Sequence, residues 1–68
     1  MDTPDRPAVK QIRVVAAQHR DKPEEKAAVA LAAHIRMFFD PHMQTQLRAA
    51  NAAGEIGDPV IERAITLI

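Results

Sequence analysis

The sequence predicts an all-α fold, a small bundle of about four short helices. Its larger apolar residues recur three and four positions apart, which is the spacing of one helix face. Three X-Pro pairs, at Pro23, Pro41 and Pro59, restart that pattern, and proline fits the first turn of a helix. No stretch alternates apolar and polar residues as a half-buried strand would. We therefore expect residues 1–68 to form one small domain, with residues 1–6 frayed.

Composition indicates a thin core. Thirteen of the thirty-two apolar residues are alanine, and burying an alanine methyl group stabilises a fold far less than burying Leu or Phe. Single cores of this size rarely supply more than about 3–5 kcal/mol. We expect the chain to be stabilised by a partner or by self-association.

Charge and hydropathy exclude several classes of protein. Nine basic and nine acidic residues give a formal net charge of zero, whereas a nucleic-acid binder is usually visibly basic. No apolar run approaches the roughly 18–20 residues of a membrane span, and no signal-peptide pattern is apparent. We expect a cytoplasmic chain with no nucleic-acid and no membrane partner.

The first predicted helix runs over about residues 7–19. Pro7 lies in its first turn, and the segment 20–22 ends it before Pro23. Its predicted core face comprises Ala8, Ile12, Val15, Ala16 and His19.

The second predicted helix, about residues 23–39, carries apolar residues on two faces. Its principal stripe is Ala28, Leu31, Ile35 and Phe38, so we assign Phe38 to the core. Phe39 is displaced from Phe38 by about 100° and is the better candidate for an exposed anchor.

The opposite face of this helix has two interpretations. Val29, Ala33 and Met37 lie four residues apart, roughly opposite Leu31. Alanine-rich sequence can simply reflect good helix propensity, or the second face can contact another protein. The second interpretation gives a predicted partner interface of Val29, Ala33, Arg36, Met37, Phe39 and His42.

Two further helices are predicted over about residues 41–53 and 59–68. Asp40 and Asp58 precede their prolines and suit the N-cap position. Gly54 suits a C-terminal cap. The predicted core faces are Met43, Leu47 and Ala50 in the third helix, and Ile61, Ala64, Ile65 and Ile68 in the fourth.

Residues that could carry chemistry are sparse. The three histidines, His19, His34 and His42, lack the spacing of a helical metal pair, and there is no cysteine. No serine is present and the two glycines are isolated, so neither a serine nucleophile nor a phosphate loop is available. We expect no catalytic, cofactor-binding or metal-binding residue, and no enzyme activity from this chain alone.

One stretch carries a family resemblance. The run His34-Ile35-Arg36-x-Phe38-Phe39-Asp40-Pro41-x-Met43, followed by Asp58-Pro59-Val60 and a last helix containing Ala64, resembles the delta subunit of cytosolic NAD-dependent formate dehydrogenases. It extends over about residues 24–68. The family usually has Trp at Phe39, Arg at His42, a basic residue at Gln44 and Gly-Gly where this chain has Gly54-Glu55.

The resemblance implies an accessory subunit that associates with a larger complex and helps its stability or cofactor maturation. That complex oxidises formate to carbon dioxide. Its large alpha subunit holds a molybdenum or tungsten pterin, and iron–sulfur clusters and FMN carry electrons to NAD. None of the matched residues implies a ligand for these groups.

A second functional class is compatible with the helical pattern. The corner at Phe39-Asp40-Pro41 could be the turn of a helix-turn-helix regulator or an antitoxin-like binder. The third helix would then offer Gln44, Gln46, Arg48 and Asn51 to a partner, with little phosphate-binding charge around them.

Overall fold

The computed structural model describes residues 6–68 and confirms the all-α prediction. Its four helices are α1 (Pro7–Gln18), α2 (Glu24–Phe38), α3 (Pro41–Ala52) and α4 (Pro59–Thr66). Each ends one or two residues before the predicted boundary. The expected fraying of residues 1–6 falls, except for Arg6, outside the described residues, and Arg6 is the N-cap of α1 with extended backbone.

The predicted caps of α3 and α4 are confirmed. The Asp40 carboxylate accepts a hydrogen bond from the Met43 amide at 2.8 Å. Asp58 accepts from the amides of Val60 and Ile61 at 2.9 and 3.4 Å. Each carboxylate thus satisfies amides that have no partner inside the first helical turn.

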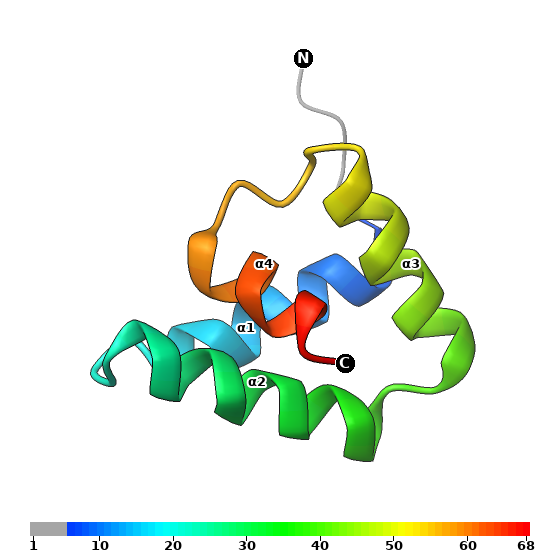
Figure 1. Cartoon of the computed structure of the whole chain (residues 1–68). Helices are drawn as coiled ribbons and strands as arrows, with labels where there is room; N and C mark the ends of the chain where they lie inside the picture. The colour runs from blue at the N-terminus through cyan, green and yellow to red at the C-terminus, as the bar shows by residue number, and fades with distance from the viewer. Residues whose placement is uncertain (1–5) are drawn as a thin grey trace.

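The four helices pack so that α4 contacts all three others (Figure 1). In this view α4 lies at the centre, with α1 behind it and α2 below it. The most extensive packing joins α2 to α4, two helices separated in sequence by the whole of α3. This arrangement covers one face of α2 and leaves the opposite face outward.

The core draws on every helix. Its largest fully buried side chains are Val9, Ile12, Leu31, Ile35, Leu47 and Ile61. The remainder is mostly alanine, as composition predicts, together with Ile56, Phe39 and Ile65. Among the predicted core residues, Val15, Met43 and Ile68 are only partly buried and pack against the edge of this cluster.

The two phenylalanines have exchanged their predicted roles. Phe38 was assigned to the core but is 67% exposed, and Phe39 was assigned to the surface but is only 5% exposed. Both assignments are wrong for the same reason. The buried residues of α2 are Ala27, Ala28, Leu31, Ala32 and Ile35, and periodicity places Phe38 and Phe39 about equally far from their centre.

The end of the helix separates the two rings. At 100° per residue, Phe38 and Phe39 each lie about 50° from the centre of the five buried positions, on opposite sides of it. The helix also ends at Phe38, and Phe39 takes an extended conformation with φ −97° and ψ 127°. Phe39 therefore leaves the helix while its side chain enters the core.

The segment between α3 and α4 begins with the predicted glycine cap. Gly54 has a φ of 73°, a left-handed conformation that favours glycine. The amide of Glu55 donates to the carbonyl of Ala50 at 2.9 Å, and the amide of Gly54 donates to Asn51 at 3.1 Å. This pair of bonds is a Schellman motif. It turns the chain so that Ile56 is buried at 3% exposure.

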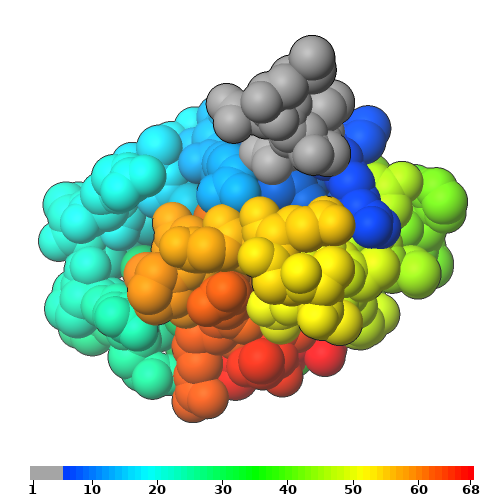
Figure 2. Space-filling view, turned by 90° about the horizontal axis from the view of Figure 1, so that it is seen from above, coloured from blue at the N-terminus to red at the C-terminus, as the bar shows by residue number. Residues whose placement is uncertain are grey.

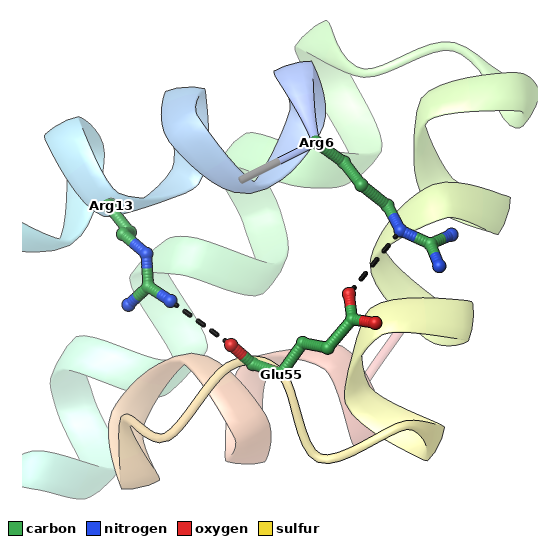
Figure 3. Close-up of polar contacts among 3 residues, drawn as sticks. All are labelled: Arg6, Arg13 and Glu55. Carbon is green, nitrogen blue, oxygen red and sulfur yellow. Dashed lines mark hydrogen bonds and ion pairs between the residues drawn. The ribbon is translucent and has the colours of Figure 1, made fainter. Parts of the chain in front are cut away.

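Arg13 ties α1 to this segment. Its Nη2 donates to the carbonyl of Ile56 at 2.9 Å and to that of Glu55 at 3.3 Å. Figure 2 shows the segment lying against α1 on one face of the molecule. Arg6 adds an exposed ion pair of 3.5 Å with the Glu55 carboxylate (Figure 3), and exposed pairs of this kind contribute little.

Within residues 6–68, no helix is both long enough and apolar enough to cross a lipid bilayer. This finding agrees with the sequence, in which no apolar run reaches that length.

The exchanged phenylalanines give a paired test of the corner. Phe39→Ala should lower the free energy of unfolding by about 3–5 kcal/mol, because it removes a buried ring. Phe38→Ala should change it by about 0.5 kcal/mol or less, as is usual at an exposed position. Urea unfolding followed by circular dichroism measures both, and equal effects would contradict the assignment.

Arg13 gives a second test. Arg13→Met keeps the aliphatic stem but leaves the carbonyls of Glu55 and Ile56 without this donor, so unfolding should become easier by about 1–3 kcal/mol. Arg6→Met is the matched control and should cost less than about 1 kcal/mol, because its ion pair is exposed. Equal losses for the two variants would show that the Arg13 bonds do not stabilise the fold.

Candidate functional site

The outward side of α2 carries an apolar surface. We define the outer face of α2 by six of its residues outside the buried stripe: Val29, Ala30, Ala33, His34, Met37 and Phe38. The charged residue that projects onto this side of α2 is Lys26, which is exposed and lies between Ala33 and Met37 in helical projection. A surface helix of a soluble protein usually presents several charged residues on this side, so the composition of this face is unusual.

The large side chains of this face are well exposed. Met37 is 74% exposed, Phe38 is 67% exposed and Val29 is 55% exposed. Together with Val14 on α1 they are the exposed large hydrophobic residues found in the described part of the chain. Three of the four lie on α2: Met37 is next to Phe38 in the chain, whereas Val29 lies about 180° from Phe38 around the helix. Grouped exposure, unlike isolated exposure, marks an interaction surface, and here it rests on the adjacent pair Met37 and Phe38.

His34 joins the two phenylalanines. Its ring centroid lies 4.7 Å from that of Phe38 and 6.0 Å from that of Phe39, the second contact being edge-to-face. The side chain is partly buried between the core and the outer face. His34 therefore lies at the edge of the core, where its ring packs against the ring of Phe38.

The charged residues that flank the face are engaged by α4. Arg36 donates a hydrogen bond to the carbonyl oxygen of Leu67. Glu25 pairs with Arg63 at 3.5 Å. Both side chains thus interact toward α4, on the covered side of α2, and Lys26 remains as the charged residue on the outer side.

The structure places the six predicted interface residues in different settings. Val29, Ala33 and Met37 are exposed together on the outer face of α2, and Arg36 lies at its edge. Phe39 is in the core, as described above, and cannot serve as an exposed anchor. His42 is exposed on α3, where its Nε2 lies 3.0 Å from the side-chain amide of Gln46.

Phe38 is the residue that the sequence reasoning missed. It belongs to the outer face although it was assigned to the core. Periodicity could not identify it, because Phe38 and Phe39 lie about equally far from the centre of the buried stripe. The end of the helix at Phe38 decides which of the two rings enters the core.

A small cavity lies at the other end of α2. It has a volume of about 160 Å³ and is lined by Ala16, His19, Arg20, Lys22, Ala27, Asp58 and Val60. Lys22 Nζ lies 2.8 Å from Nδ1 of His19, so these two basic groups already pair with one another. The cavity is smaller than the roughly 300 Å³ of the smallest usual ligand pockets.

Known proteins do not identify the chain: no family model, no curated protein and no solved structure matches it. In residues 6–68, no three side chains among histidines, aspartates and glutamates are grouped as metal ligands would be. Within the described residues, the outer face of α2 is our candidate functional site, because its large apolar side chains are exposed.

Proposed function

We propose that this chain is a non-catalytic accessory subunit of a cytosolic NAD-dependent formate dehydrogenase complex, and that it docks through the outer face of α2. The identity of the complex comes from the residue pattern at 34–43 and 58–64. The docking surface comes from one observation, the exposure of Met37 and Phe38 beside that pattern.

The motif residues divide into two groups by what they do for the fold. Phe39 fills the core, Asp40 caps α3, and Pro41 occupies the first position of that helix. These three account for the corner. Met37 and Phe38 do nothing comparable for the chain itself, since most of each side chain faces solvent. Contact with another protein would explain why Met37 and Phe38 are apolar.

The composition of the face suits contact with another protein. Aromatic residues, methionine and arginine are enriched in protein interfaces, and charged residues are depleted at their centres. Phe38, Met37 and Arg36 provide these residue types, with the uncharged strip of Val29, Ala30 and Ala33 beside them. Methionine also adapts its shape to a partner because its side chain is unbranched and flexible.

The partner in this proposal is the large alpha subunit, which would hold the molybdenum or tungsten pterin of the complex. Iron–sulfur clusters, FMN and NAD would belong to the assembly and not to this chain. Formate oxidation itself would take place elsewhere in the complex. The contribution of this chain would be to stabilise the assembly or to assist cofactor insertion by covering a surface of the large subunit.

The helix-turn-helix alternative receives less support. The connection between α2 and α3 is two residues long, whereas the DNA-binding motif usually has a three- or four-residue turn. Along α3 the one formally cationic side chain is Arg48. Phosphate contacts normally require several such groups.

Affinity capture tests the proposal. A tagged copy of this chain, purified from the cells that produce it, should retain a pterin-bearing subunit identified by mass, and the eluate should reduce NAD when formate is added. The Met37→Ala/Phe38→Ala variant should retain at least about tenfold less of that subunit, because exposed hydrophobic anchors dominate binding energy. Its circular dichroism should match that of the wild-type chain.

Val14→Ala is the matched control, because Val14 is also apolar and 62% exposed but lies on α1. It should capture as much as the wild-type chain. Capture without any formate-dependent activity, or equal capture by the Met37→Ala/Phe38→Ala variant, would contradict the proposal.

A further inference from the structure

We propose that Met37 is an oxidation site on the outer face of α2, and that conversion of its thioether to the sulfoxide makes this face polar and weakens docking. The effect on docking rests on the proposed function. The selective oxidation of Met37 and the resulting change in surface polarity do not, because they are properties of the chain alone.

Exposure separates Met37 from the other methionine in the described part of the chain. Met37 is 74% exposed, near the end of α2. Met43, in the first turn of α3, is partly buried and packs against the core cluster. Met1 lies outside the described residues. A peroxide in solution reaches an exposed thioether more readily than a packed one, so Met37 should react before Met43.

The composition of the chain leaves few competing groups. It contains no cysteine, no tryptophan and no tyrosine, which are other side chains that oxidants commonly attack. Methionine is therefore the residue type that a mild peroxide would modify in this chain. Within residues 6–68, exposure concentrates this reactivity on one sulfur, which belongs to the exposed apolar pair Met37 and Phe38.

The reaction balances with a peroxide as the oxidant. The Met37 sulfur attacks one peroxide oxygen, an S–O bond forms, and the O–O bond breaks. Sulfur loses two electrons and the peroxide gains them. The transferred oxygen gives up its proton to the departing oxygen, which leaves as water when the oxidant is hydrogen peroxide. No side chain of the protein has to act as an acid or a base in this step.

The product changes the character of the docking surface. A sulfoxide is polar and accepts hydrogen bonds, whereas the thioether is apolar. Burying such an acceptor against a partner without a donor is unfavourable. The guanidinium of the neighbouring Arg36 already donates to the carbonyl of Leu67, on the covered side of α2. Oxidation of Met37 thus replaces an apolar anchor with a group that favours solvent.

The same change should spare the fold. Met37 is not among the buried residues of α2, and most of its surface already faces solvent. Met43 packs against the core, so a sulfoxide there would disturb the edge of the core. Selective oxidation of Met37 therefore alters the surface of the chain while the helices keep their packing.

Peptide mass mapping of the purified chain tests the selectivity. Hydrogen peroxide should oxidise Met37 at least about fivefold faster than Met43 in the folded chain. The two rates should become equal in a concentration of urea that unfolds the chain, because both sulfurs are then exposed. Equal rates in the folded chain would overturn the inference.

Retention on a hydrophobic interaction column tests the change in polarity without any partner. The oxidised wild-type chain should elute earlier than the untreated chain with the same circular dichroism. Methionine sulfoxide reductases, which reverse the oxidation, should restore its retention. Met37→Leu is the matched control, since it stays apolar at this position and retains Met1 and Met43. Peroxide should change its retention much less, and an equal change in both chains would overturn the inference.

Affinity capture extends the test to docking. The oxidised wild-type chain should retain at least about threefold less of the pterin-bearing subunit than the untreated chain. Peroxide should not change capture by Met37→Leu relative to its own untreated sample. Equal capture by oxidised and untreated wild-type chain would overturn the effect on docking. Failed capture by the untreated chain would instead contradict the proposed function, and the peptide map and the column would still decide whether Met37 is the oxidation site.

Discussion

The hydrogen bonds from Arg13 to the carbonyls of Glu55 and Ile56 join α1 to the segment that leads into α4. Ile56 anchors this segment in the core, and Asp58 caps α4 directly after it. Because α4 packs against every other helix, fixing its start also fixes how the inner face of α2 is covered. The outer face of α2 is therefore defined by contacts made on the far side of the bundle.

The features that could be predicted from sequence are local ones. Asp40 and Asp58 were recognisable because a capping carboxylate and the proline after it are adjacent in the chain. Gly54 was recognisable because a helix C-terminus favours a left-handed residue. The roles of Arg13 and Ile56 could not be predicted, because the partners of Arg13 lie 42 and 43 residues away along the chain.

The second helix could be predicted only in part. Val29, Ala33 and Met37 were correctly placed on its exposed side, because helical periodicity determines which residues lie opposite the core. The two phenylalanines were not, because both lie about equally far from the centre of the buried stripe and the helix ends between them.

The pairing of α2 with α4 has a consequence for biosynthesis. α4, which packs most extensively on the inner side of α2, is translated only after the whole of α3, so α2 leaves the ribosome with α1 as its one earlier packing partner and its outer face uncovered. A nascent chain in this state is a substrate for chaperones and is prone to aggregate. The core of the bundle can be completed only after the buried residues of α4, Ile61, Ala64 and Ile65, have been translated.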